Sequence, residues 1–378
     1  MTMRSNLNLL LVLALLLAFS GCRPDDPPPP DGGAPPAGAE LQVVATFSIL
    51  GDLVHQVGGE HIRLRTLVGP DGDAHTFQPS PKDSVMLHEA RLVFENGLGF
   101  EGWLDDLFDA SGSTAERIVV TRSIEAHRID QADQPADRQG DQLEDEDRRD
   151  GHRHHEHHDH AEGDRHDESA DGHDHEERED DADGPHDHGH DHVEHTHAHH
   201  HGEFDPHAWH AVPHAIAMVS EIAEALAGAD PANAASYQAN RDRSISELRE
   251  LDAWVRTQVD RIPAERRVLV TTHDTFGYFA DQYGLRTVNV LGSVSSESSD
   301  PSAAAVARVV EQIKATGVPA VFAENILNPR LTEQIARQAG VRVVGPLLTD
   351  ALGAADREGS SYTAMIRHNV QTIVEALQ

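Results

Sequence analysis

Short apolar runs alternate with amphipathic segments along two stretches of the chain, residues 41–121 and 267–347. The apolar runs read as short strands, and the segments between them have helical spacing. Strands that alternate with helices are typical of parallel sheets, so the pattern predicts an α/β fold with two similar βα lobes. The predicted strands are residues 41–50, 62–68, 91–97 and 117–121 in the first stretch, and residues 267–273, 286–292, 320–325 and 341–347 in the second.

A longer helical pattern separates the two stretches. After Asp230-Pro231 no Gly or Pro occurs until Pro263, and Leu248, Leu251 and Val255 belong to one apolar stripe with spacings of three and four. A helix over residues 231–262 would be about 48 Å long, enough to run along both lobes as a rigid spine. Two helices with a break near Asn240 are the alternative.

A polar insert interrupts the first stretch. Residues 128–203 hold 27 Asp/Glu, 7 Lys/Arg and 18 of the 28 histidines of the chain, and no aromatic residue. Such a segment buries too little apolar surface to offset the entropy lost on ordering, so we predict that it is disordered. The formal net charge of the whole chain is −35, which argues against nucleic acid and anionic membrane surfaces as partners.

The N-terminus has the pattern of an export signal. Arg4 precedes an apolar run over residues 7–21, which is too short to span a membrane comfortably, and Cys22, the single cysteine, follows in "FSGC". This pattern resembles a bacterial lipoprotein signal with Cys22 as the lipidated residue; an ordinary secretory signal is the alternative. The predicted organisation is a signal peptide (1–21), a Pro-rich tether (22–40), an N-terminal lobe (41–212) with the insert 128–203, a helical region (213–262) and a C-terminal lobe (263–378).

Four potential metal ligands follow predicted strands or begin a helix. His75 lies in the Gly/Pro-rich loop after the second strand, and His207 lies just before a helix that begins at Pro213. His273 ends the strand "VLVTTH", and Asp350 follows the last strand. Ligands of open parallel sheets bind where the loops at the carboxyl ends of strands converge. Two residues from each lobe would therefore meet at a metal site in the cleft between the lobes.

These segments carry a family resemblance. "DAHTFQPSP", "DPHAW", "VTTHDTFGYFADQYGL", "FAENILNP" and "GPLLTDALG" together resemble the zinc/manganese-type (cluster A-I) substrate-binding proteins of bacterial ABC transporters, including the zinc-specific members with a His-rich loop. The likeness runs from residue 41 to residue 378 apart from the insert. It implies two βα lobes joined by a rigid helix, a metal at their interface, and delivery of that metal to a membrane permease.

The resemblance implies that the ligands are His75, His207, His273 and Asp350. Manganese-type members carry a carboxylate at the third position, where this chain has His273. Three imidazoles and a carboxylate suit Zn²⁺ in tetrahedral geometry, whereas Mn²⁺ prefers more oxygen ligands. Ala74 stands where some zinc members have a glutamate ligand, so Asp350 is left as the fourth ligand, with Glu324 or water as the alternative.

We therefore expect an extracytoplasmic, monomeric zinc-capture protein that delivers Zn²⁺ to an ABC importer. It would lie in the periplasm or on the outer face of the cytoplasmic membrane, anchored through Cys22. A four-ligand site leaves no open position for water, and neither GxSxG nor HExxH occurs, so we expect no enzyme. The alternatives are a periplasmic zinc buffer or metallochaperone that uses the His tract, and a manganese importer of the same family; a periplasmic zinc metallochaperone is also a possible partner.

The remaining histidines divide into two groups. Those of the insert are neutral in large part at pH 7, so we interpret the tract either as an antenna that passes zinc to His207 or as a weak buffer. His210 and His214 lie one and two turns beyond His207 and are left undecided. The others are predicted to be structural: His55, His61, His88, His127 and His368.

Overall fold

A computed structural model of the chain describes residues 40–129, 203–289, 303–355 and 359–378. The predicted signal peptide, the tether and almost all of the His-rich insert lie outside the described residues. By internal contacts the chain divides into residues 1–41 and residues 42–378, and the description below concerns the second unit. No helix of the described part is long and apolar enough to cross a membrane.

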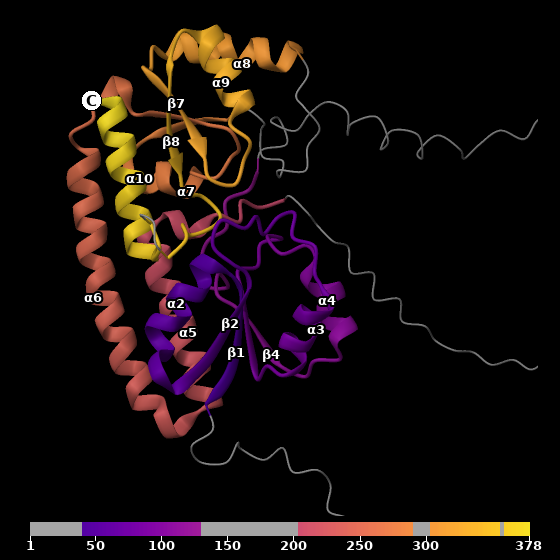
Figure 1. The fold of residues 1–378 in the computed structure, drawn as a ribbon. Helices are drawn as coiled ribbons and strands as arrows, with labels where there is room; N and C mark the ends of the chain where they lie inside the picture. The colour runs from indigo at the N-terminus through magenta and orange to yellow at the C-terminus, as the bar shows by residue number, and fades with distance from the viewer. Residues whose placement is uncertain (1–39, 130–202, 290–302, 356–358) are drawn as a thin grey trace, which may run out of the picture. The chain divides into compact units, whose positions relative to one another are not determined.

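The first lobe is built on a four-stranded sheet with the order β2-β1-β3-β4 (Figure 1). Strand β3 pairs in parallel with both β1 and β4. The strands are β1 (Leu41–Phe47), β2 (Ile62–Val68), β3 (Leu92–Glu95) and β4 (Glu116–Val119). The carboxyl ends of the parallel strands share one edge of this sheet, and the loops that leave this edge are the ones that form the site below.

Four α-helices accompany this sheet: α2 (Ser48–Gly58), α3 (Pro81–His88), α4 (Leu104–Ser111) and α5 (Val212–Ala229). One face of the sheet and helices α3 and α4 enclose a core that includes Val44, Val93, Leu87 and Leu104. Helix α3 begins at a capping box, in which the side chains of Ser80 and Asp83 satisfy free backbone N–H groups of the first turn.

The second lobe contains two parallel strand pairs, β5 with β6 and β7 with β8, and β5 lies beside β7. The strands are β5 (Val268–Thr271), β6 (Arg286–Asn289), β7 (Ala320–Glu324) and β8 (Arg342–Leu347). The helices are α7 (Gly277–Tyr283), α8 (Ala303–Thr316), α9 (Arg330–Ala339) and α10 (Tyr362–Leu377). Val270, Ile313, Val321 and Ile335 form part of its core. The predicted fold class, α/β with parallel sheets and a long helix, is confirmed.

Helix α6 (Ala234–Val259) is the long helix that the apolar stripe predicts. It is continuous through Asn240, so the alternative of two broken helices is wrong. It is shorter than predicted, because residues 231–233 form a separate 3-10 turn, η5, and the helix ends at Val259. Leu248, Leu251 and Val255 are buried as expected, and α6 packs against α2 and α5 of the first lobe and against α7 and α10 of the second.

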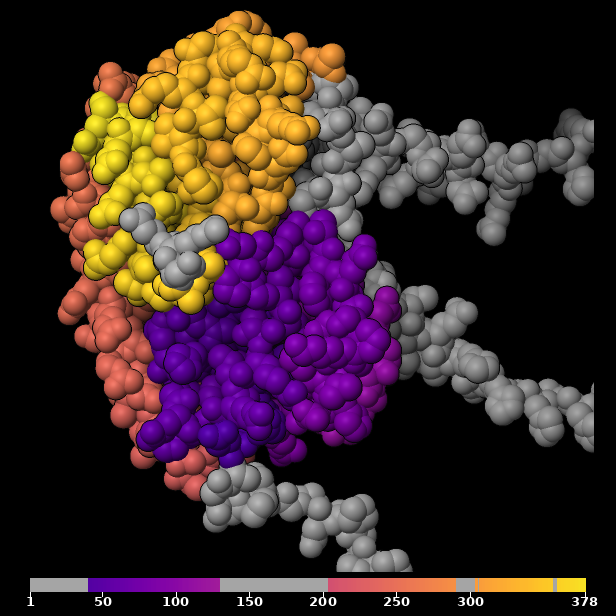
Figure 2. Space-filling view, viewed as in Figure 1, coloured from indigo at the N-terminus to yellow at the C-terminus, as the bar shows by residue number. Residues whose placement is uncertain are grey.

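Backbone and side-chain hydrogen bonds tie the lobes together. The N–H of Leu352 donates to Ser48 Oγ at 3.0 Å, and the N–H of Tyr362 donates to Asp52 Oδ2 at 2.8 Å. Trp209 Nε1 donates to the carbonyl of Thr349 at 3.0 Å. Figure 2 shows the two halves, indigo and magenta against orange and yellow, in direct contact on the viewed face.

Several predicted boundaries differ from those of the structure, and two of these differences have a clear physical reason. The strand predicted over residues 41–50 ends at Phe47, because the apolar run continues into the buried first turn of α2 and periodicity alone does not separate the two. The insert predicted as disordered over residues 128–203 is too wide. Arg128 and Phe204 form an antiparallel bridge, and the N–H of Ile129 donates to the carbonyl of Glu203 at 3.0 Å, so the two ends of the insert meet in a short neck.

Candidate metal centre

The four side chains predicted as ligands come together in the structure. One donor atom from each of His75, His207, His273 and Asp350 lies within 4.8 Å of the other three. His75 follows β2 and His207 precedes the 3-10 turn η4 (Ala208–His210), while His273 follows β5 and Asp350 follows β8. Each lobe therefore contributes two residues, although the four are spread along the sequence from residue 75 to residue 350.

His75 lies in an irregular loop that is held from two sides. Its backbone N–H donates to Asp73 Oδ1 at 2.8 Å, and Trp103 Nε1 donates to the carbonyl of Ala74 at 2.7 Å. Asp71 donates from its N–H to the carbonyl of Leu352 in the second lobe at 2.9 Å. The side chain of His75 is the most exposed of the four at 12 %, so the ion meets solvent most closely on this side.

His207 is oriented by a carboxylate two residues before it. Asp205 Oδ1 lies 2.7 Å from Nδ1 of His207 and also accepts a hydrogen bond from its backbone N–H at 3.0 Å. With Nδ1 engaged in this way, Nε2 is the nitrogen that faces Asp350 and His75. A carboxylate on the second nitrogen fixes the ring orientation and makes the imidazole a stronger donor toward a metal.

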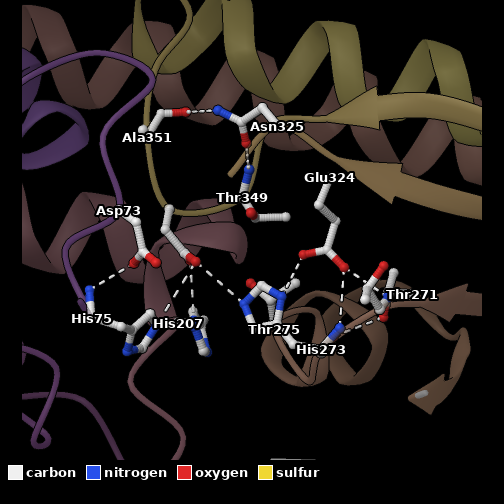
Figure 3. Close-up of polar contacts among 12 residues, drawn as sticks. Asp73, His75, His207, Thr271, His273, Thr275, Glu324, Asn325, Thr349 and Ala351 are labelled. Atoms are coloured by element: carbon white, nitrogen blue, oxygen red, sulfur yellow. Dashed lines mark hydrogen bonds and ion pairs between the residues drawn. The ribbon is translucent and has the colours of Figure 1, made fainter. Parts of the chain in front are cut away.

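His273 is oriented in the same way from the second lobe. Its Nδ1 is in contact with Glu324 Oε2, and its Nε2 lies 3.2 Å from Asp350 Oδ2 (Figure 3). Glu324 Oε1 accepts hydrogen bonds from the backbone N–H groups of Thr272 and His273. Glu324, the alternative fourth ligand of the sequence analysis, thus lies outside the group of four and contacts His273 from the other side of the ring.

Asp350 carries the strongest physical argument for a cation. Its side chain is fully buried, and neither of its carboxylate oxygens has a hydrogen-bond partner among the described residues. A buried carboxylate without donors is costly unless a positive charge lies next to it. Nε2 of His207 lies 3.4 Å from Asp350 Oδ1, and Nε2 of His273 and of His75 lie 3.2 and 3.8 Å from Oδ2.

The spacing of the donor atoms fits a small tetrahedral ion. Ligands about 2.0–2.1 Å from a tetrahedral zinc lie roughly 3.3 Å from one another. The separations are 3.2 Å between His75 and His207, 3.2 Å between His273 and Asp350, 3.4 Å between His207 and Asp350, and 3.8 Å between His75 and Asp350, and all lie within 4.8 Å. Two imidazole nitrogens this close can share one proton in a hydrogen bond, or both can direct their lone pairs at a cation that replaces that proton.

The protonation of the site differs between its two halves. Burial lowers the pKa of His75 to about 4, and the attraction of Asp350 offsets this only in part. Burial also acts to lower the pKa of His273, but Glu324 and Asp350 outweigh it and hold that pKa well above its usual value. Burial acts to raise the pKa of Asp350, and His273, His207 and His75 overcome this and hold it well below its usual range.

The other histidines of the described residues lie outside the group of four. His210, left undecided by the sequence, is fully buried behind Trp209 and against Phe276, and burial lowers its pKa to about 3. His214 lies against Tyr278. Sequence reasoning missed the role of Asp205, although the spacing Asp-Pro-His in "FDPHAW" places a carboxylate two residues before the ligand candidate.

A two-lobed parallel α/β fold with three imidazoles around a buried carboxylate at the contact of the lobes defines a protein of the divalent-metal-binding class. Comparison with known proteins agrees. The family model "ZnuA: Zinc-uptake complex component A periplasmic" matches residues 43–376. The chain belongs to this family, which confirms the resemblance at the level of the family.

The relatives and solved structures that resemble the chain differ in their metals. The "Manganese-binding lipoprotein MntA" of Halalkalibacterium halodurans is 27% identical over 368 residues, which cover 97% of this chain and 96% of the relative. The "Iron-binding protein YfeA" of Yersinia pestis is 25% identical over 336 residues, 89% of this chain and 86% of the relative. The periplasmic zinc-binding protein TroA of Treponema pallidum has a TM-score of 0.66 and 25% identity, covering 90% of this chain and 99% of that structure.

Proposed function

We propose that this chain captures Zn²⁺ outside the cytoplasm and delivers it to an ABC-type importer, with His75, His207, His273 and Asp350 as the ligands. The observation that carries the proposal is the fully buried Asp350 carboxylate, which has no hydrogen-bond partner among the described residues and has three imidazole Nε2 atoms within 3.2–3.8 Å. Four protein ligands close a tetrahedral site and leave no position for a reactive water, so the site suits a carrier rather than a hydrolase.

The division of ligands between the lobes supports release as well as capture. Two donors come from each lobe, so the complete donor set exists only while the lobes are in contact. A movement that separates the lobes would leave each half with two donors and a much weaker hold on the ion. A permease that binds the protein and separates the lobes would therefore receive the ion.

Zinc is favoured over manganese by the donor chemistry. Three imidazoles and one carboxylate match the borderline-soft, four-coordinate preference of Zn²⁺, whereas Mn²⁺ favours oxygen donors. The second candidate function is manganese import, and it is supported by the relatives, since several of them are named manganese-binding lipoproteins. His273 is the residue on which the two candidates differ.

Metal analysis tests the proposal directly. The protein would be purified without added ions from cells in defined medium, and zinc, manganese and iron would be measured per chain. We expect one tightly held zinc per chain once weakly bound ions are removed. Manganese in the same stoichiometry would establish the second candidate function in its place.

A matched variant sharpens this test. His273→Glu combined with Glu324→Gln gives the third position a carboxylate without placing it against the Glu324 carboxylate, which lies beside His273 in the wild-type protein. The double variant should have a lower ratio of zinc to manganese affinity than the wild-type protein, and Glu324→Gln alone controls for loss of the supporting carboxylate. An unchanged ratio would show that the third position does not set the metal preference.

The location and the His tract extend the proposal. We infer that Cys22 carries a lipid that anchors the chain outside the cytoplasmic membrane, and mass spectrometry of the mature N-terminus tests this.

The neck formed by Arg128 and Phe204 places the base of the tract three residues from His207. This proximity supports the antenna interpretation over a separate buffer. A permease-dependent defect in zinc uptake after gene deletion would favour import, whereas normal uptake with reduced zinc tolerance would favour buffering or exchange with a metallochaperone.

A further inference from the structure

An asparagine follows a parallel strand at the same place in each lobe. Asn96 comes directly after β3, and Asn325 comes directly after β7. The two strands end alike, with Phe94-Glu95-Asn96 in the first lobe and Ala323-Glu324-Asn325 in the second. Both asparagines therefore lie at the carboxyl edge of a sheet, where the loops that carry the four candidate ligands begin or pass.

In the first lobe, Asn96 is completely buried and its side chain bonds to the segment that carries His207. Asn96 Nδ2 donates to the carbonyl of Pro206 at 2.9 Å, which is the peptide group that joins Pro206 to His207. Pro206 has no N–H, and the segment between the neck and η4 has no regular structure. The bond to Asn96 thus fixes the backbone at the point where the direction of the His207 side chain is set.

Asn96 is itself held by a strained turn. Gly97, Leu98 and Gly99 all have positive φ angles, and Leu98 is a residue type that rarely adopts them. The buried carboxylate of Glu101 accepts hydrogen bonds from the N–H groups of Asn96 and Gly97 at 2.7 and 3.2 Å. The sequence "NGLGFEG" therefore builds a rigid support for Asn96.

In the second lobe, Asn325 brackets Asp350. Its Oδ1 accepts a hydrogen bond from the N–H of Thr349 at 3.1 Å, and its Nδ2 donates to the carbonyl of Ala351 at 3.3 Å. Figure 3 shows Asn325 between Thr349 and Ala351. One side chain thus fixes the backbone on both sides of Asp350, whose carboxylate has no hydrogen-bond partner among the described residues.

We propose that Asn96 and Asn325 are a matched pair of positioning residues, one in each lobe, that hold the loops of His207 and Asp350 in the geometry that binds the metal. Neither asparagine donates to the metal. Each acts on the backbone next to a ligand, so its removal leaves all four ligands present and misplaces one of them. This inference rests on the proposed function of the site.

The structure offers a matched control. Asn240 Nδ2 donates to the carbonyl of Val57 at 2.9 Å between α6 and α2, which is the same kind of bond at the same length as that of Asn96. Neither Asn240 nor Val57 belongs to a loop that carries a candidate metal ligand. Asn240→Ala therefore reports the loss of an amide–carbonyl bond without an effect on the site.

The experiment compares Asn96→Ala, Asn325→Ala and Asn240→Ala. Each substitution is made in a protein that lacks residues 130–202 and is otherwise complete, so that the His tract does not contribute. Zinc affinity is measured by competition with a chromophoric chelator, and the melting temperature is measured without metal. We expect all three substitutions to lower the melting temperature, but only Asn96→Ala and Asn325→Ala to weaken zinc binding, by about tenfold. Asn96→Asp, which keeps the size and loses the donor to Pro206, should weaken it equally.

A second readout separates positioning from stability. Co²⁺ in place of zinc reports ligand geometry in its visible absorption. The two site variants should change the intensity of the Co²⁺ spectrum, and Asn240→Ala should leave it unchanged. If the Asn96→Ala protein does not fold, the inference is tested on the Asn325→Ala protein, because Asn325 is only partly buried. If the Asn96 and Asn325 variants have the zinc affinity and Co²⁺ spectrum of the wild-type protein, this inference is wrong and the proposed function stands. If the wild-type protein itself has no tight metal site, both the proposed function and this inference are wrong.

Discussion

The two lobes contribute equally to the metal centre in number but differently in charge. The first lobe supplies His75 and His207, and the pKa of His75 is lowered, so this imidazole is a neutral donor at pH 7. The second lobe supplies His273 and Asp350, and the carboxylates around His273 hold a proton on it. In the metal-free protein the positive charge that Asp350 needs is thus provided by His273.

This difference shows how the site remains intact without metal. A cavity with an unpaired buried carboxylate would be strongly destabilised, whereas protonated His273 between Glu324 and Asp350 neutralises the second-lobe half. When the ion binds, it replaces that proton. His75, whose pKa is lowered to about 4, needs no proton loss to bind the ion at neutral pH.

Removal of one ligand from each lobe should have the largest effect. We expect His75→Ala and His273→Ala each to weaken zinc binding by roughly 100- to 1000-fold, because four ligands share about 10–16 kcal/mol of binding free energy, about 3–4 kcal/mol each. Affinity is measured by chelator competition after removal of residues 130–202. His88→Ala, at an exposed position on α3, is the control. Retention of wild-type affinity in either ligand variant would mean that one lobe holds the metal alone.

The supporting carboxylates should have the next largest effect. Asp205→Asn and Glu324→Gln leave every ligand in place and replace the charged acceptor on the second imidazole nitrogen with a neutral amide, so each should weaken zinc binding about 10- to 100-fold. Glu324→Gln also removes one of the charges that hold the proton on His273. Its loss of affinity should therefore be smaller at pH 6 than at pH 8, whereas Asp205→Asn should show no such trend. If the loss of zinc affinity depended on pH in the same way in both variants, the proposed difference in charge between the two lobes would be wrong.

The pH dependence of the wild-type protein measures the proton directly. His273 has a raised pKa, so its charged form stabilises the metal-free fold at acid pH, and this stabilisation is lost as the pH rises through the pKa of the folded state. Zinc affinity should therefore rise about tenfold per pH unit until that pKa is passed. His75, with a pKa of about 4, adds nothing to this slope near neutral pH. Calorimetry at pH 7 in buffers of different ionisation enthalpy should give about one proton released per zinc, and no release would contradict the assignment of the proton to His273.

The smallest effect is expected from the His tract. Deletion of residues 130–202 leaves the neck between Arg128 and Phe204, and the dissociation constant of the tight site should change by less than about twofold because its ligands lie outside the deleted segment. The same deletion should abolish the additional weak zinc sites in a calorimetric titration. Loss of the tight site would show that the tract supplies a ligand, and the division between tract and site would then be wrong.

Much of this architecture follows from local patterns. The apolar runs predict the strands, and the spacing of Leu248, Leu251 and Val255 predicts α6, because burial on one face imposes a regular period. The placement of His75, His273 and Asp350 after strands, and of His207 just before a helix, predicts their convergence, because the loops at the carboxyl edge of a parallel sheet converge.

The supporting residues could not be found in this way. Asn96 and Pro206 are separated by more than a hundred positions, and their contact depends on the return of the chain from the insert to the first lobe. Glu324 could be either a ligand or a support, since the choice depends on the side on which His273 lies. Local sequence contains no information on such distances, so these roles became visible only in three dimensions.

The central claim is that two side chains from each lobe meet around one divalent ion. An anomalous-scattering map of zinc-containing crystals, recorded on both sides of the zinc absorption edge, tests this most directly. We predict one strong peak about 2.0–2.1 Å from Nε2 of His75, His207 and His273 and from an oxygen of Asp350. A peak bound by residues of a single lobe, or no zinc peak among these four side chains, would contradict the account.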